Sequence, residues 1–350
     1  MKFSIGYQID ERDALVPAIL RHAARVQEVY FAFGDFPNGR HKQTRSSYLL
    51  PYEAQERQLA DLDRLHKAGI ALNLLLNGNC YGADSLSRSF FSKIGDTVDY
   101  LASRFSLPSV TTPSPGIAKF LHSNFAGIEV RASVNMAVGT PTAMGYIADS
   151  FDSFYLKREL NRDMAAIRRA RAWCDANGKG LFMLANSGCL NECPLHTFHD
   201  NLVAHEEELA TRDNAFTFES MCGARLSQRK AMVSLLRDSN FVRPEDIALY
   251  EGPFTAAKLA TRVNPHPVRI IEAYMAGRYI GNLADLLEPD HAARMYPYVL
   301  ENSEIPPGFA ERVLYCDKQC ETCGYCERTF EGALKKINEG ALIYADKQDD

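Results

Sequence analysis

Four cysteines stand close together near the C-terminus of this 350-residue chain, in the segment CDKQCETCGYC. Cys316, Cys320, Cys323 and Cys326 have the spacing C-x3-C-x2-C-x2-C. Thiolates at this density can surround one metal centre without help from the rest of the chain. Four unligated thiols on a loop are the weaker interpretation, because exposed free cysteines are reactive and rare. The spacing therefore predicts a separate metal centre, and both zinc and an iron–sulfur cluster accept four cysteines.

A second group of cysteines follows apolar runs elsewhere in the chain. Cys80 ends LLLNGNC, Cys189 and Cys193 follow GLFMLAN in SGCLNECP, and Cys222 ends AFTFESMC. Proline follows Cys193, as it follows the last ligand at some iron–sulfur sites. The alternative is that Cys189 and Cys193 are small buried apolar residues, as free cysteines often are. Their place in a loop after a strand favours ligation.

Few other residues of the sequence are candidate ligands or catalytic groups. His196 and His199 follow Cys193 and could be ligands or could donate hydrogen bonds to ligands. Cys174 lies within a helical pattern, and we expect a structural role for it. The chain has neither a G-x-S-x-G nucleophile turn nor an H-E-x-x-H zinc helix, so a peptidase reaction would lack a visible catalytic group.

The elements that position these residues alternate in a regular way. Short runs rich in Val, Ile, Phe and Tyr alternate with helical patterns, as in parallel β/α units. The predicted strands are 2–9, 26–33, 70–77, 109–114, 127–134, 151–158, 180–186 and 256–262, and the predicted helices are 14–26, 52–68, 91–105, 115–125, 140–149 and 162–177. Eight strands predict a TIM-like (β/α)8 barrel whose active site lies at the C-terminal strand ends. An open doubly wound sheet is the alternative, but no glycine-rich dinucleotide fingerprint follows the first strand.

Three arginines stand at or just beyond predicted strands. Arg131, Arg158 and Arg262 are therefore expected to face the barrel mouth, where a guanidinium group can hold a carboxylate by two hydrogen bonds. The alternative for each is a structural ion pair, for example Arg158 with Glu159. Another such pair is expected between Arg243 and Glu245 or Asp246.

Composition places the chain among globular proteins without strong polyanion affinity. It is 46% hydrophobic with a net charge of -5. No apolar run approaches the length of a membrane span, and no signal-like segment follows the N-terminus, so we expect a cytoplasmic protein. Nine cysteines in a reducing compartment favour metal or redox chemistry over disulfides. The composition of the sequence changes near Leu286, where proline-rich SEIPPGF and the dense cysteine group follow. This change predicts a barrel domain over 1–287 and a Cys-rich extension over 288–350.

Several segments, in this order, resemble the collagenase-like peptidase family: SVNMAVGTPTAMGYI, FDSFYLKRELNRDMAAIRRA, LANSGCLNECPLHTFHDN, FVRPEDIALYEG, AAKLATR and AYMAGRYIGNL. The resemblance covers most of 2–287. It implies a barrel-like α/β fold and a four-iron four-sulfur (4Fe–4S) cluster bound by four cysteines. It also implies an oxygen-independent hydroxylation of ubiquinone precursors or RNA bases, with prephenate as a hydroxyl source in some members.

Carried onto this sequence, the resemblance implies Cys189, Cys193 and Cys222 as cluster ligands, with Cys80 as the fourth. The rival is a three-cysteine site with an open iron or a histidine ligand. The tail cysteines depart from the usual family pattern, which allows a second metal centre. The resulting expectation is an iron–sulfur oxidoreductase that modifies a small aromatic or nucleobase substrate and uses a prephenate-like donor. RNA is an alternative partner, and the competing functions are a metal-dependent peptidase and a non-catalytic iron–sulfur subunit that pairs with a homologue.

Overall fold

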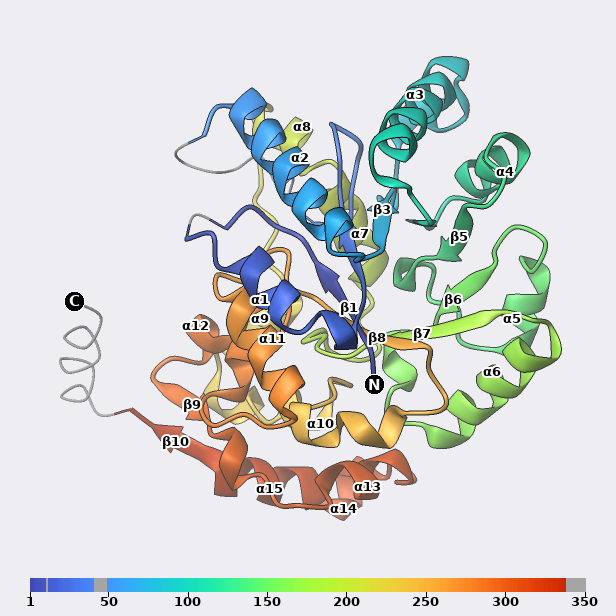
Figure 1. Cartoon of the computed structure of the whole chain (residues 1–350). Coiled ribbons are helices and arrows are strands. Elements are labelled where there is room, and N and C mark those ends of the chain that lie inside the picture. The colour runs from blue at the N-terminus through green and yellow to red at the C-terminus, as the bar shows by residue number, and fades with distance from the viewer. Residues whose placement is uncertain (11, 41–48, 338–350) are drawn as a thin grey trace.

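Eight parallel strands close into a barrel in the order of the chain (Figure 1). The computed structural model describes residues 1–10, 12–40 and 49–337. Each strand pairs with the next, and the eighth pairs with the first. The strands are β1 (Phe3–Gly6), β2 (Val26–Phe31), β3 (Leu72–Leu75), β4 (Ser109–Thr112), β5 (Glu129–Ala132), β6 (Ser153–Tyr155), β7 (Gly180–Leu184) and β8 (Ala256–Leu259). All eight lie inside the predicted runs, so the predicted TIM-like barrel is confirmed.

Helices surround the barrel and connect its strands (Figure 1). The six predicted helices are present, with ends that differ by a few residues. Ser87, Ser114, Thr140 and Asp163 begin four of them, because each side chain accepts a hydrogen bond from a backbone N–H of the first turn. The α-helices are α1 (Leu15–Arg21), α2 (Pro51–Lys67), α3 (Arg88–Phe105), α4 (Pro115–Asn124), α5 (Pro141–Tyr146), α6 (Met164–Ala176), α7 (His196–Ala204), α8 (Glu206–Ala210), α9 (Met221–Leu226), α10 (Ser234–Arg237), α11 (Pro267–Ala276), α12 (Ala292–Met295), α13 (Phe309–Leu314), α14 (Cys320–Cys323) and α15 (Tyr325–Ala333).

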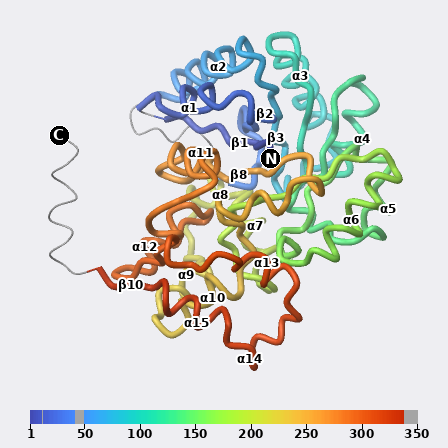
Figure 2. The backbone as a smooth tube through the Cα atoms, turned by 60° about the horizontal axis from the view of Figure 1, so that its bottom comes forward, coloured from blue at the N-terminus to red at the C-terminus, as the bar shows by residue number. Residues whose placement is uncertain are grey.

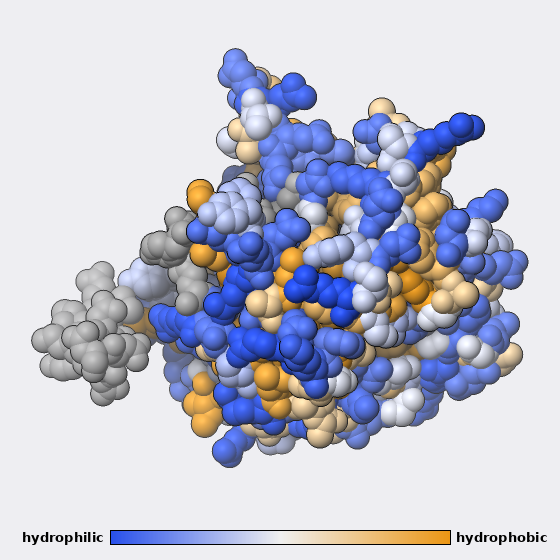
Figure 3. Space-filling view, turned by 45° about the horizontal axis from the view of Figure 1, so that its top comes forward, coloured by the Kyte–Doolittle hydropathy of each residue, from blue (hydrophilic) through white to orange (hydrophobic). Residues whose placement is uncertain are grey.

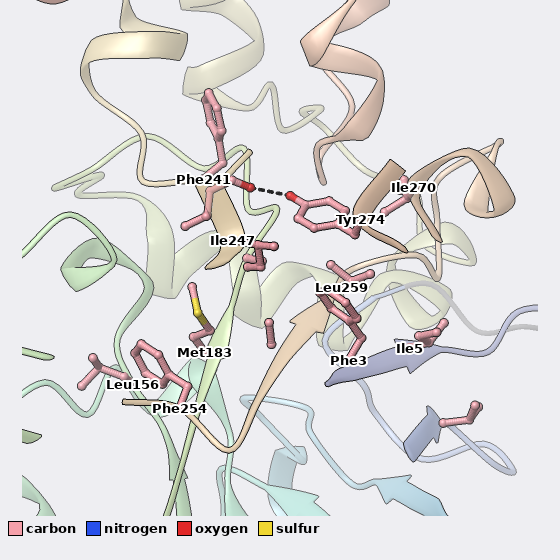
Figure 4. Packing of buried hydrophobic residues seen from close by; sticks show 14 of the residues in the cluster. Phe3, Ile5, Leu156, Met183, Phe241, Ile247, Phe254, Leu259, Ile270 and Tyr274 are labelled. Atoms are coloured by element: carbon pink, nitrogen blue, oxygen red, sulfur yellow. Dashed lines mark hydrogen bonds between the residues drawn. The ribbon is translucent and has the colours of Figure 1, made fainter. Parts of the chain in front are cut away.

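The hydrophobic core has two layers, because successive side chains of a strand point to opposite faces. In β7, Leu181 and Met183 join the large outer core between strands and helices, whereas Phe182 and Leu184 belong to a small cluster inside the barrel. Figure 4 shows the outer layer where β1, β7 and β8 approach α11. There the Tyr274 hydroxyl donates a 2.5 Å hydrogen bond to the Val242 carbonyl. The barrel is thus filled by side chains, and only its ends are available for chemistry.

The C-terminal segment packs along one side of the barrel. Figures 1 and 2 show α13, α14 and α15 along one edge of the molecule. A two-stranded antiparallel sheet joins β9 (Tyr298–Leu300) to β10 (Leu334–Lys336). Phe309 and Phe330 are fully or almost fully buried and belong to the same continuous core as the outer layer. The predicted extension 288–350 lies within the described residues as far as 337, and its separate status stays a prediction.

The surface carries mostly hydrophilic side chains on the face shown in Figure 3, with apolar ones scattered among them. In the ranges that the structure describes, no helix combines the length and the apolar character needed to cross a membrane.

Candidate functional site

A polar cavity opens at the C-terminal ends of the strands. Its lining combines four cationic side chains with one carboxylate, from Arg40, Arg158, Lys258, Arg262 and Glu288. Asn77, Asn135 and the Tyr30 ring complete the polar part of the wall. This end of a parallel β/α barrel is where such proteins bind their ligands. The described lining carries more positive than negative charge, which suits a small anionic ligand.

Two of these charged groups keep unpartnered polar atoms. Arg262 Nη1 donates a 2.9 Å hydrogen bond to Asn38 Oδ1, but Arg262 Nε and Nη2 are buried with no partner among the described residues. Glu288 Oε1 accepts a 2.6 Å hydrogen bond from Arg40 Nε. Glu288 Oε2 is buried and has no hydrogen-bond partner among the residues that the structure describes. Because an unsatisfied buried polar group is costly, these atoms indicate that a ligand or water belongs here.

Lys258 contributes an amino group to the wall of this cavity. It is the third residue of β8, and its Nζ lies 4.0 Å from the centroid of the Tyr30 ring and 5.2 Å from that of Tyr155. Burial, together with the charge of Arg262, lowers the pKa of Lys258 to about 7. The amine therefore changes its protonation near neutral pH, where it can hold an anion or exchange a proton.

Hydrogen bonds hold the loop that carries Cys189 against the segment around Glu288. Gly188 N donates to the Glu288 carbonyl at 2.9 Å, and the His291 ring contacts the Gly188 carbonyl at 2.9 Å. A Cβ atom at Gly188 would lie 2.8 Å from the Pro289 carbonyl oxygen, so the close approach requires glycine. These contacts fix the Cys189 thiol beside the cavity, since Arg158 Nη1 donates to its sulfur at 3.4 Å.

Three of the predicted barrel cysteines act on one another electrostatically. Burial raises the pKa of the Cys222 thiol, and the nearby thiols of Cys189 and Cys193 raise it further. The Cys80 loop is tied to α7, which begins shortly after Cys193, by a 3.2 Å hydrogen bond from Asn79 Nδ2 to Asp200 Oδ2. The structure thus brings the Cys80 loop next to α7, the helix that follows Cys189 and Cys193 in the chain. Within residues 1–10, 12–40 and 49–337, no three His, Cys, Asp or Glu side chains are arranged around a single metal ion.

The two predicted histidines lie in α7 with different partners. His196 Nε2 is 2.8 Å from Arg158 Nη2 and 3.3 Å from Asp200 Oδ2. Burial and the Arg158 charge lower the pKa of His196, which favours the neutral ring. The His199 ring packs on Phe218 with centroids 5.0 Å apart. His196 therefore contacts the same guanidinium group as Cys189 and belongs to the surroundings of that thiol.

Arg131 lies elsewhere than expected. Its guanidinium group is buried inside the barrel toward the N-terminal strand ends, where Nη1 lies 2.5 Å from Glu28 Oε1 and Nη2 lies 2.9 Å from Glu129 Oε2. It also stacks 3.9 Å from the centroid of the Phe182 ring. The prediction that Arg131 faces the mouth is therefore wrong, because its side chain turns toward two carboxylates at the opposite end. Arg158 and Arg262 do line the mouth.

The expected structural ion pair of Arg243 is present. Arg243 donates two hydrogen bonds to the Asp246 carboxylate, at 2.7 and 3.0 Å, inside the buried start of η6 (Pro244–Tyr250). Arg158, by contrast, contacts Cys189 and His196 in place of the expected Glu159.

The four tail cysteines line a separate cavity. Cys316, Cys320, Cys323 and Cys326 share its wall with Arg237, Arg312, Lys318 and Glu327. Burial raises the pKa of Cys326 to about 11, with smaller contributions from Cys320 and Cys316. The described cysteines form no disulfide.

Three mouth residues escaped the prediction from sequence, namely Arg40, Lys258 and Glu288. Lys258 could have been found from the sequence, because lysine is unusual inside an apolar strand such as AAKLA. A lysine at such a position indicates a side chain that faces the barrel interior. Arg40 and Glu288 lie outside strands, 248 positions apart, and only the fold brings them together.

Comparisons with known proteins support the fold and a distant relationship. No protein-family model matches the chain. The chain is 25% identical over 276 residues to an uncharacterized protease of Methanocaldococcus jannaschii, covering 77% of this chain and 79% of that protein. Among solved structures it is similar to a U32 peptidase, with a TM-score of 0.51 and 16% identity over 74% of this chain and 91% of that one.

Proposed function

The chain resembles the collagenase-like (U32) peptidase family, and from that premise we propose that it is an iron–sulfur enzyme whose barrel mouth binds a small anionic molecule. The proposal extends to an oxygen-independent modification, such as hydroxylation, of an aromatic or nucleobase substrate. The observation that carries it is the contact between Arg158 and Cys189, which joins a cation-rich cavity to a cysteine group.

The residues that would hold the cluster are Cys189, Cys193 and Cys222, with Cys80 as the fourth. The Cys80 loop is bonded to α7, and the thiols of Cys189, Cys193 and Cys222 are close enough to influence one another, which supports this set of ligands. Thiolates are the usual ligands of a 4Fe–4S cluster, which is a one-electron carrier when bound.

The anion would bind through the cations of the cavity. Arg262 offers two buried donor atoms without partners, and Lys258 adds an ammonium group on the same strand end. A carboxylate accepts paired hydrogen bonds from a guanidinium group in a fixed geometry, so Arg262 would set the orientation of the ligand. Lys258, with its pKa of about 7, would hold or move a proton at the bound molecule.

Adding a hydroxyl group from water to an aromatic carbon releases two electrons and two protons. A reaction of this class therefore needs an electron acceptor and a route for protons. The protein contributes a cavity with a charged lining, a titratable amine and an orienting guanidinium group. The identity of the relative as a protease points to peptide hydrolysis as the competing activity.

The test is to purify the full chain without oxygen and to measure iron, sulfide and peptidase activity on a casein substrate. We expect iron and sulfide in equal amounts and no peptide release. Cys193→Ala and Cys80→Ala are compared with Cys174→Ala, whose thiol is fully buried in α6, away from the mouth. Both mouth variants should lose iron to a similar extent while the control retains it. Peptide release that persists in Cys193→Ala would contradict the proposal, as would equal iron in all three variants.

A further inference from the structure

The C-terminal cavity offers a second site, whose wall comes from the segment 312–327 and from Arg237. Its volume is about 320 Å³, and all four tail cysteines line it. Three of them are exposed, and Cys326 is half-buried. Nothing in the barrel mouth contributes to its wall. The site can therefore bind its own group independently of the mouth.

The backbone wraps the cysteines around this space by two tight turns. Cys316 follows α13, and Lys318 then adopts a left-handed conformation with φ 60°. Cys320 and Cys323 stand at the two ends of α14, and Gly324, with φ 61°, turns the chain into α15, where Cys326 is the second residue. A left-handed conformation is unfavourable for lysine, so the turn at Lys318 is a strained point of the segment. The two turns leave all four cysteines in the wall of the cavity.

The size of the cavity favours a polynuclear cluster over a single ion. A zinc ion binds four sulfurs at about 2.3 Å each, which places the sulfurs within about 4 Å of one another around one point. All four tail cysteines line one cavity of about 320 Å³, which has room for a group larger than a single ion. We propose that Cys316, Cys320, Cys323 and Cys326 bind an iron–sulfur cluster of the four-iron type, distinct from the centre at the mouth.

The surroundings supply the positive charge that such a cluster requires. Arg162 is 6% exposed and its Nη2 has no partner among the described residues. Burial lowers the pKa of Arg162, whereas the nearby groups of Tyr250, Cys326, Asp246 and Cys316 raise it. An anionic four-thiolate cluster close to Arg162 would stabilise this buried cation further. Arg237 is held at the cavity by Asp238 and Glu327, at 2.7 and 2.8 Å.

The experiment uses the full chain, purified without oxygen, in three forms. In the tail variant Cys316, Cys320, Cys323 and Cys326 are all replaced by serine, in the mouth variant Cys189, Cys193 and Cys222 are replaced by serine, and the control is Cys174→Ser. Iron, acid-labile sulfide and zinc are measured per chain, and the reduced proteins are examined by electron paramagnetic resonance. The tail variant should lose about four iron and about four sulfide relative to the control, and the mouth variant should keep them.

Two results would overturn the inference. One is about one zinc per chain in the control that disappears in the tail variant. The other is unchanged iron and sulfide in the tail variant. If the fourfold variant fails to fold, the single change Cys320→Ser at an exposed position replaces it, with an altered resonance signal expected and an identical one contradictory. Arg162→Met is the second probe, and it should reduce the iron retained after dialysis against a chelator, whereas equal retention would contradict the role of Arg162. These outcomes do not depend on the proposed cluster at the mouth. If that cluster is absent, the mouth variant will contain as much iron as the control.

Discussion

Both ends of the barrel hold buried arginine and glutamate side chains, but within the described ranges those at the N-terminal end are fully paired and those at the mouth are not. At the N-terminal end, Arg131 is matched by Glu28 and Glu129, and every one of its nitrogen donors has a partner. At the mouth, Arg262 and Glu288 each keep at least one buried polar atom without a partner in the described residues. Buried charge costs free energy unless it is compensated. The difference separates a cluster that stabilises the fold from one prepared for a ligand.

Short polar side chains complete the N-terminal cluster. Ser4 Oγ donates to Glu28 Oε1 at 2.9 Å, and Asn73 Nδ2 donates to the same oxygen at 3.2 Å. These residues come from β1 and β3, on either side of β2. The network therefore ties adjacent strands together, and its removal should be felt as lost stability and not as lost binding.

The largest effect is expected for Arg131→Met. The change leaves the buried Glu28 carboxylate without its cation, and breaking such a pair costs roughly 3 to 5 kcal/mol. Chemical denaturation should report this loss in the free energy of unfolding. The double variant Arg131→Met with Glu28→Gln should recover part of it. A cost below about 1 kcal/mol for the single variant would mean that the N-terminal cluster is not structural.

A smaller effect is expected for Lys258, and it depends on pH. The pKa of Lys258 falls from 10.5 in the unfolded chain to about 7 in the fold. Below pH 7 both states carry the proton, so the destabilising effect of the buried ammonium is fully present. Between pH 7 and 10.5 the unfolded state binds more protons, and stability contributed at this site rises with pH. Lys258→Met should therefore be more stable than the natural protein at pH 6, by a margin that shrinks toward pH 10.

The same titration should change ligand binding in the opposite sense. Prephenate, a cyclic dicarboxylate, should bind more weakly as Lys258 loses its charge, by on the order of tenfold between pH 6 and pH 9. Lys258→Met should flatten this dependence. Calorimetric titration at several pH values measures it, and an unchanged slope in the variant would exclude Lys258 as the titrating group.

The smallest effect is expected for Glu129→Gln at the rim of the N-terminal cluster. The Glu129 side chain is 38% exposed, so its pair with Arg131 is screened by water. The free energy of unfolding should fall by about 1 kcal/mol or less. A loss as large as that of Arg131→Met would show that Glu129 and not Glu28 carries the pairing.

The sequence predicted the parts of this fold that depend on local patterns. All eight strands followed from short apolar runs. The metal centre predicted from the spacing of Cys316 to Cys326 stays a prediction, although the four cysteines line one cavity. The direction of a charged side chain does not follow from its strand. Arg131 and Lys258 each occupy the third position of a four-residue strand, yet one serves the N-terminal cluster and the other the mouth.

What decides between them is the neighbours from other strands. Glu28 on β2 forms an ion pair with Arg131. Lys258 instead shares a cavity with Arg262 and Glu288, which come from segments outside the barrel strands. Such pairings join residues far apart in the chain, and only the closed barrel defines them. The predicted cysteine ligands of the mouth stay a prediction for the same reason, since Cys80 and the Cys189–Cys193 pair lie in two loops and Cys222 lies in α9.

The most direct test of the central claim, an anion site at the mouth, is a calorimetric titration of prephenate into the natural protein, Arg262→Met and Arg169→Met at pH 6. Arg169 is an exposed residue of α6 and serves as the matched loss of one surface charge. Loss of paired, charge-assisted hydrogen bonds at Arg262 should weaken binding by about tenfold or more, while Arg169→Met binds like the natural protein. Equal affinity in all three proteins, or no binding by the natural protein, would contradict the account.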